Sequence, residues 1–315
     1  GVWGVSFILY LINGAVTEPI LFLRRGFPPC KVLLTTRKII IGTGILFAGI
    51  ILFGGIRLAV LERPMNPEKE KAEKAGEWVT AALIQQNTDP RKHEYKTSLD
   101  ILTRLTDEAL LAAPETDIVA WSETAFVPNI RRWGAMQPED HKYARLVHQL
   151  REYQEDMGTW LVTGNDDYTI TTDENGEELR LEYNAAILFS DKGERKETYH
   201  KIHLVPFTEY FPFKEQLPWL YQMLMDFDVY LWEPGTERTV FHHPKFSFST
   251  PICFEDAFPQ DVRLFVNDGA EVILNLSNDF WSLTNVEAKQ HYINSLFRAV
   301  ENRRTLLRAT ASGLT

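Results

Sequence analysis

The chain has 315 residues, of which 44% are hydrophobic and 24% charged, which provides enough apolar material for one large domain or two smaller ones. The net charge is −10 and no basic stretch is present, which argues against a nucleic-acid partner. The two cysteines, Cys30 and Cys253, are too widely spaced for a disulfide framework or a zinc site, and the eight histidines show no metal-ligand spacing near them. We therefore expect neither a metal nor another cofactor.

Two apolar segments open the chain. Val2 to Thr17 is uncharged and, after an acidic residue and a proline, the apolar character resumes over Ile20 to Leu23. Ile39 to Ile56 is a second uncharged run of about 18 residues, close to the length that crosses a bilayer as a helix. Its glycines suit close packing against other membrane helices. The alternative is a buried helix of a soluble protein. We predict two transmembrane helices within residues 1–60.

The charges between these segments predict the orientation. The loop from Arg24 to Lys38 carries basic residues and no acid. Short loops rich in Lys and Arg stay cytoplasmic, which would place everything after about residue 60 on the outer face of the membrane. In a bacterium with two membranes, this predicts a multi-pass protein of the inner membrane with its large domain in the periplasm. Residues 61–77 are charged, contain two prolines and are interpreted as a juxtamembrane linker.

From residue 78 onward, short apolar strands alternate with amphipathic helices, which predicts an α/β domain. The predicted strands are Val79–Gln85, Asp117–Trp121, Trp160–Thr163, Ala185–Phe189, Phe248–Ile252, Glu271–Leu276 and Thr305–Ala309. The predicted helices are Ser98–Ala112, His141–Tyr153 and Asn285–Arg303.

Glu123 is the first candidate site residue. It follows the predicted strand that ends at Trp121, in the sequence DIVAWSETAF. A carboxyl group beside aromatic and apolar residues tends to have a raised pKa, which suits a general base. A solvated glutamate in a turn is the alternative.

Lys201 and Glu209 form a second candidate group in the sequence YHKIHLVPFTEYFP. In this apolar and aromatic setting they could form a buried charge pair, and the lysine could face a developing oxyanion. A purely structural ion pair is the alternative.

Cys253 is the third candidate, in STPICFEDAF, where a predicted strand ends and where we expect Glu255 and Asp256 to open a helix. The helix dipole and free N–H groups at such a position favour a thiolate, and the N–H of Phe254 could donate to an oxyanion. A small buried cysteine without chemistry is the alternative.

These three segments, in this order, resemble the Glu–Lys–Cys triad of the nitrilase (carbon–nitrogen hydrolase) superfamily. The segments ALIQQNTDP, YNAAILF, EVILNLSNDFW and QHYINSLFRAVENRRTLLRATASG also resemble that family, over roughly residues 78 to 315. LVPFTEYFP, the FRAVENRR segment and the preceding apolar runs look most like apolipoprotein N-acyltransferases. The resemblance implies a nitrilase-like α-β-β-α sandwich at residues 78–315. We expect this domain to be truncated at its C-terminus, and the opening Gly suggests a fragment or a shortened reading frame, with a cleaved signal peptide as the alternative.

The resemblance implies a role for each candidate residue. Glu123, Lys201 and Cys253 match the catalytic glutamate, lysine and nucleophile, whereas Glu209 and Glu255 match two supporting glutamates. Three positions depart from the family pattern: this chain has Phe254 in place of Tyr, Ser122 in place of Pro and Thr208 in place of Gly. None of them removes a triad group.

The implied activity transfers an acyl chain from a phospholipid to the amino group of an apolipoprotein's N-terminal diacylglyceryl-cysteine, through a thioester on Cys253. The implied partners are therefore a phospholipid donor, a lipidated protein acceptor and a membrane. One alternative is a membrane-tethered carbon–nitrogen hydrolase (amidase) that uses water, and another is an inactive truncated lipid-binding membrane protein. The aromatic segment from Phe211 to Trp232 is predicted to be an amphipathic lid that dips into lipid, or else a core helix.

Overall fold

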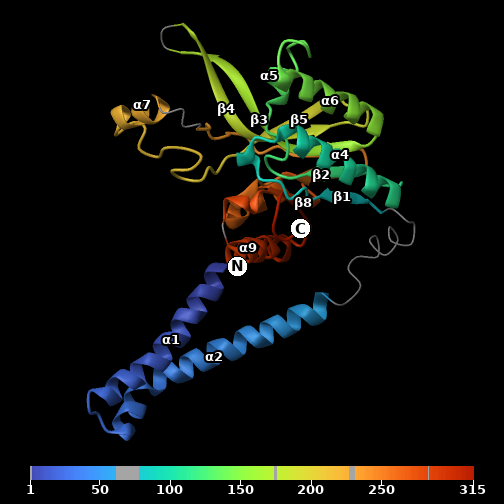
Figure 1. Cartoon of the computed structure of the whole chain (residues 1–315). Coiled ribbons are helices and arrows are strands. Elements are labelled where there is room, and N and C mark those ends of the chain that lie inside the picture. Colours follow the sequence, from blue (N-terminus) through green and yellow to red (C-terminus); the bar gives the residue numbers. More distant parts are fainter. Residues whose placement is uncertain (1, 62–77, 174–175, 227–230, 283) are drawn as a thin grey trace. The chain divides into compact units, whose positions relative to one another are not determined.

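The computed structural model describes residues 2–61, 78–173, 176–226, 231–282 and 284–315 (Figure 1). The chain divides into two compact units, Gly1–Trp78 and Val79–Thr315. The linker that we predicted at residues 61–77 lies, apart from its first residue, outside the described residues.

The first unit contains two long helices, α1 (Val2–Arg24) and α2 (Pro29–Leu61). Each holds a stretch long and apolar enough to cross a membrane, Gly4–Arg24 and Thr36–Val60, and neither stretch is buried by protein. The predicted basic loop is shorter than expected, because α2 already begins at Pro29 and carries three of the basic residues. Proline is well tolerated in the first turn of a helix, and nothing after it interrupts the helical sequence.

The second unit contains a five-stranded sheet in the order β1-β2-β3-β4-β5. Its strands are β1 (Ala81–Ile84), β2 (Ile118–Trp121), β3 (Trp160–Thr172), β4 (Glu178–Phe189) and β5 (Arg195–His200). The first three strands are parallel, and β4 and β5 continue the sheet in antiparallel fashion.

A four-stranded sheet follows, in the order β6-β7-β8-β9. Its strands are β6 (Val240–His243), β7 (Phe246–Ser249), β8 (Val272–Ser277) and β9 (Thr305–Thr310). β6 and β7 are antiparallel, whereas β7, β8 and β9 are parallel. The parallel strands bring the ends of β8 and the nucleophile segment to one edge, where Ile252 pairs with Leu276.

The helices of the second unit are α4 (Tyr95–Ala112), α5 (Ile130–Trp133), α6 (Lys142–Met157), α7 (Pro218–Asp226), α8 (Pro259–Asn267) and α9 (Asn285–Asn302). The described part of this unit also contains three short 3₁₀ helices, η1 (Pro90–Lys92), η2 (Cys253–Ala257) and η3 (Asp279–Trp281).

The two sheets pack face to face. Ile118 and Ala120 of β2 belong to the core between the sheets, whereas Val119 and Trp121 belong to the core beneath α4 and α6. This separation follows from the alternation of side chains along a strand. On the far side of the four-stranded sheet, α9 packs against β9 and η2 (Figure 1). The predicted α-β-β-α sandwich is confirmed.

Several elements differ from the sequence prediction. β3 and β4 run well beyond the predicted strands and pair along their whole length as one hairpin, because polar residues on an exposed strand hide its extent from an apolar pattern. The helix that we expected to open with Glu255 and Asp256 is the short η2, and α8 begins only at Pro259. Proline at the first helical position is preorganised for a helix, which places the start of α8 there.

Candidate active site

The three candidate segments meet at the ends of strands. Glu123 follows β2, and Lys201 directly follows β5. Cys253 follows Ile252, which forms an isolated β-bridge with Leu276. Cys253, Glu123 and Glu209 line one cavity of about 490 Å³. Residues that lie 78 and 155 positions apart from Glu123 in sequence are hydrogen-bonded to it. The structure therefore brings together the residues that the sequence pointed to separately.

Lys201 is completely buried and lies between two carboxylates. Its Nζ donates to Glu209 Oε1 at 2.7 Å and to Glu123 Oε1 at 3.2 Å. Burial lowers the pKa of Lys201, but the charges of Glu123, Cys253 and Glu209 outweigh burial and raise the pKa above its usual value. The ammonium is therefore charged at neutral pH. Since an ammonium has three protons, one donor remains beyond those used by the two glutamates.

Glu123 is 3% exposed, which excludes the solvated turn glutamate. Besides Lys201, its Oε1 accepts a hydrogen bond from Asn184 Nδ2 at 2.8 Å, and its Oε2 accepts one from the backbone N–H of Asn278 at 3.1 Å. These contacts hold the carboxylate in one orientation towards the cavity. Sequence reasoning missed both asparagines, because neither lies near Glu123 in the chain.

Glu209 is fixed from two sides. Its Oε2 accepts a hydrogen bond from the backbone N–H of Val205 at 2.8 Å, while Oε1 holds Lys201. Its own carbonyl accepts a hydrogen bond from the N–H of Trp232 at 2.8 Å. These contacts fix the Glu209 carboxylate against Lys201. Glu209 also lines the same cavity as Cys253.

Cys253 has a left-handed backbone, with φ of 51°, which is uncommon for any residue other than glycine. Burial and the charge of Glu123 raise the pKa of its thiol well above the usual value, against the opposing effects of Lys201 and a hydrogen bond with Ser277. The expectation that a helix terminus favours the thiolate is therefore wrong. The five-residue η2 has a weak dipole, and burial of the thiol, followed by the charge of Glu123, has the larger effect on its pKa.

Glu255 lies outside the cavity and ties two segments together. Its Oε1 accepts hydrogen bonds from the Tyr199 hydroxyl at 2.8 Å and from the N–H groups of Ile202 and His203 at 2.8 and 3.0 Å. Its Oε2 accepts one from the N–H of Ile252 at 2.7 Å. Glu255 therefore fixes the backbone that follows Lys201 against the backbone that precedes Cys253.

The three positions that depart from the family pattern have different surroundings. Phe254 lines the cavity, and its ring meets Phe258 edge to face with centroids 5.1 Å apart. Thr208 also lines the cavity. Ser122 is fully buried and its hydroxyl donates to Gln86 Oε1 at 3.2 Å, which explains how a polar residue is accommodated there.

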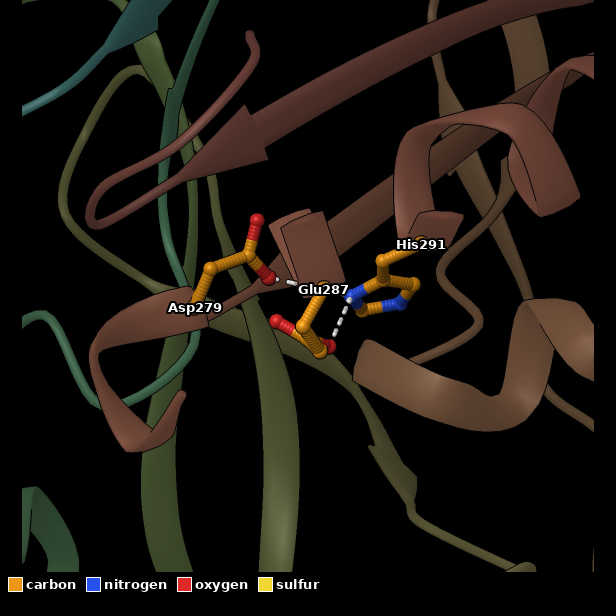
Figure 2. A group of neighbouring side chains, drawn as sticks. All are labelled: Asp279, Glu287 and His291. Carbon is orange, nitrogen blue, oxygen red and sulfur yellow. Dashed lines mark hydrogen bonds and ion pairs between the residues drawn. The ribbon is translucent and has the colours of Figure 1, made fainter. Parts of the chain in front are cut away.

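A second group of ionisable residues, not found by sequence reasoning, borders the same cavity. Figure 2 shows His291 with its imidazole directed at the carboxylates of Asp279 and Glu287. Nδ1 lies 3.0 Å from Asp279 and 3.9 Å from Glu287, and Nε2 lies 3.2 Å from Asp256. Burial lowers the pKa of His291, but its close contacts with Asp256 and Asp279 outweigh burial and raise the pKa to about 10. The imidazolium and the carboxylates around it form a charge network beside the cavity.

A larger cavity of about 550 Å³ adjoins the site and shares Thr124 and Trp232 with it. Its walls include the aromatic side chains of Tyr95, Phe126 and Trp133.

The segment that we predicted as a lid is exposed. Its helix α7 stands away from both sheets (Figure 1), and the Trp219 side chain is 66% exposed. Residues 227–230, also part of the predicted lid, lie outside the described residues. The described part of the segment is not a core helix.

The chain matches known proteins along most of its length. It is 40% identical to apolipoprotein N-acyltransferase 1 of Treponema pallidum over 78% of this chain and 47% of that protein. It is 35% identical to apolipoprotein N-acyltransferase 1 of Treponema denticola, over all of this chain and 58% of that protein. It thus spans about half the length of the curated relatives that it matches.

Among solved structures, a carbon–nitrogen hydrolase from Helicobacter pylori G27 has the same fold. The TM-score is 0.50 at 16% identity, covering 75% of this chain and 74% of that one. Residues 80–314 match the carbon–nitrogen hydrolase family. The chain therefore belongs to the carbon–nitrogen hydrolase family, and its curated relatives at 35–40% identity are named apolipoprotein N-acyltransferases.

Proposed function

We propose that this chain is the catalytic part of an apolipoprotein N-acyltransferase, which moves an acyl chain from a phospholipid to the N-terminal amine of a diacylglyceryl-cysteine protein. One observation carries the proposal, namely a fully buried Lys201 that holds Glu123 and Glu209 in place beside Cys253 in a single cavity. The names of the relatives supply the substrate class.

In the first half-reaction, the sulfur of Cys253 attacks the carbonyl carbon of the phospholipid ester while Glu123 accepts the thiol proton. The raised pKa of the thiol makes this base necessary, because little thiolate exists before substrate binds. When the tetrahedral intermediate collapses, the C–O bond of the ester breaks. The proton passes from Glu123 to the departing lyso-phospholipid oxygen, and a thioester remains on Cys253.

The oxyanion of the intermediate has two donors in this scheme. The third proton of the Lys201 ammonium is one, and the N–H of Phe254 in the first turn of η2 is the other. Loss of one such donor typically costs roughly 3–4 kcal/mol of transition-state stabilisation.

In the second half-reaction, the amine of the acceptor attacks the thioester and Glu123 takes a proton from the attacking nitrogen. Collapse breaks the C–S bond, forms the amide and returns the proton to the sulfur. Two substrates that react in turn with one nucleophile give ping-pong kinetics. Glu209 holds Lys201, and Glu255 holds the backbone on either side of the site, without touching the reacting atoms.

The membrane arrangement belongs to the same proposal. The spans in α1 and α2 anchor the chain in a bacterial inner membrane, and the second unit lies on the periplasmic side, where lipoprotein acceptors are met. Cys30, exposed on α2, then lies on the cytoplasmic side. A membrane-impermeant maleimide added to intact spheroplasts should leave Cys30 unlabelled until the membrane is opened. Labelling of Cys30 in intact spheroplasts would show that the chain has the opposite orientation in the membrane.

The activity is tested by incubating the detergent-solubilised chain with phospholipid alone and measuring its intact mass. We expect a gain of one acyl chain that hydroxylamine releases and that a diacylglyceryl peptide discharges as N-acyl peptide. Cys253→Ala should show no gain, whereas Cys30→Ser should behave like the unaltered chain. Release of free fatty acid, with no N-acyl peptide, would instead identify a hydrolase. A folded chain that forms no adduct contradicts the proposal.

A further inference from the structure

Two adjoining cavities of the second unit differ in the charges on their walls. The catalytic cavity, of about 490 Å³, contains Cys253. The charged residues among its described lining are all carboxylates, namely Glu123, Glu209, Asp279 and Glu287. The aromatic cavity, of about 550 Å³, is lined by three arginines and two acids, namely Arg91, Arg132, Arg180, Asp166 and Glu182. Thr124 and Trp232 line both cavities, so a ligand bound at Cys253 can extend from one into the other.

Two of the three arginines already have an acidic partner. Arg91 donates from Nε and Nη2 to the two carboxylate oxygens of Asp89, at 2.8 Å each. Arg180 pairs with Glu182, and its guanidinium carbon lies 3.9 Å from the centre of the Tyr168 ring. The positive charges of these two arginines are therefore offset before any ligand enters.

Arg132 differs from the other two arginines. It is exposed on α5, and its guanidinium carbon lies 4.8 Å from the centre of the Trp133 ring. No carboxylate in the part of the chain that the structure describes pairs with this guanidinium. A guanidinium on an aromatic face keeps its N–H donors free at the edge of the plane, where a ligand can reach them.

Asp166 is the remaining charged group of the aromatic cavity. Burial and, after it, the charge of Glu182 raise the pKa of Asp166 to about 7. The carboxyl is therefore partly protonated near neutral pH and repels an anion less than an ordinary aspartate does. The unbalanced charge of this cavity is thus the positive charge of Arg132, which favours an anionic ligand.

The proposed phospholipid donor has an anionic group close to its reacting carbon. When the ester carbon lies at Cys253, the acyl chain leaves it on one side, and the glycerol with its phosphodiester leaves it on the other. The carboxylates of the catalytic cavity repel a phosphodiester, whereas a guanidinium binds phosphate oxygens through paired N–H donors. Lys201 is not available for this purpose, because its ammonium is completely buried between Glu123 and Glu209.

We propose that the aromatic cavity holds the phosphoglycerol end of the phospholipid donor, with Arg132 as the residue that binds its phosphate. The inference rests on the proposed function, and it makes Arg132 a residue for binding the donor. The acyl chain then remains in the catalytic cavity, whose wall includes Val205 and Phe254.

The test measures the binding of two soluble lipids to the full chain in a neutral detergent, in a Cys253→Ala background that forms no thioester. One lipid is dihexanoylphosphatidylglycerol, and the other is dihexanoylglycerol, which has the same acyl chains and no phosphate. Arg132→Gln should weaken binding of the first by about tenfold, because a charge-assisted contact is lost, and leave binding of the second within about twofold. Arg132→Lys keeps the charge and should therefore lose less affinity than Arg132→Gln.

Arg104→Gln is the matched control. Arg104 is also an exposed arginine, but it lies on α4, pairs with Glu108 at 2.6 Å and lines neither cavity. Its replacement should change the affinity for neither lipid.

Equal weakening for both lipids, or unchanged binding of dihexanoylphosphatidylglycerol to Arg132→Gln, would overturn the proposal. Inorganic phosphate is a third probe: if it displaces dihexanoylphosphatidylglycerol at a similar concentration, the cavity binds free phosphate and is no donor subsite. A diacylglyceryl peptide is the fourth probe. An effect of Arg132→Gln on the peptide alone would assign the cavity to the acceptor and also overturn the proposal.

The binding assay involves no acyl transfer, so the two proposals fail separately. Binding that depends on Arg132 and on phosphate, with no thioester in the chain that retains Cys253, would leave a lipid site and remove the transferase function. Thioester formation together with binding that ignores Arg132 would leave the function and remove this subsite.

Discussion

Lys201 lies closer to Glu209 than to Glu123: the Nζ–Oε1 distances are 2.7 and 3.2 Å. Glu209 is thus the main partner of the buried ammonium, and the longer contact leaves Glu123 freer to exchange a proton. Because Lys201 is completely buried, its charge is supported only by the groups around it.

Replacement of Lys201 by Met should abolish thioester formation and destabilise the chain by roughly 3–5 kcal/mol, because two buried carboxylates lose their cation. Thermal unfolding and intact mass measure the two effects. In Lys201→Met with Glu209→Gln, part of the stability should return because one of the orphaned charges is gone, but the thioester should not. Recovery of the thioester in the double variant would show that Lys201 has no part in the chemistry.

Glu123→Gln should change two rates in opposite directions. The charge of Glu123 raises the pKa of Cys253, so its removal should lower that pKa and speed alkylation by iodoacetamide at neutral pH. Acyl transfer should fall by about 10²–10⁴-fold, since the general base is lost. Glu139→Gln, on the exposed surface, is the control and should change neither rate. Parallel losses of both rates would indicate a damaged fold.

Stability at acid pH should depend on Asp167, which is 2% exposed at its side chain and lies 2.7 Å from Arg195 and 3.0 Å from His200. Burial raises its pKa, but hydrogen bonding to His200 and the charge of Arg195 outweigh burial and lower the pKa to about 2. A lowered pKa stabilises the fold above the unfolded value of about 3.9, and this contribution disappears as pH falls towards 2.

The contribution of Asp167 amounts to about 2 kcal/mol. Asp167→Asn should therefore unfold at a lower temperature at neutral pH and lose less further stability on acidification than the unaltered chain. Thermal unfolding of both chains from neutral pH down to acid pH measures this. Parallel curves for the two chains would contradict the assignment.

The exposed face of α7 should matter only when the substrate lies in a membrane. Trp219→Ser with Leu220→Ser should slow turnover of phospholipid in vesicles, because the apolar contact with lipid is lost. Turnover of a short-chain, water-soluble ester should stay within about twofold, since α7 does not hold the triad. Equal vesicle rates for both chains would exclude a lipid-facing role for this helix.

The sequence alone determined the features that depend on local order. The apolar run at Asp117 to Trp121 predicted a buried strand, and the uncharged run from Ile39 predicted a long apolar helix. The sequence also predicted that Glu123, Lys201 and Cys253 follow apolar strands, because the end of a strand is recognised from residues only a few positions away.

Only the tertiary structure decided what surrounds those residues. Asn278 donates to Glu123 across 155 positions of sequence, and Glu255 binds backbone groups more than 50 positions away. Such contacts are set by the pairing of strands and the stacking of two sheets, which no local pattern encodes. The high pKa of Cys253 has the same origin, since the fold buries the thiol and brings the carboxylates of Glu123 and Glu209 to it from other segments of the chain.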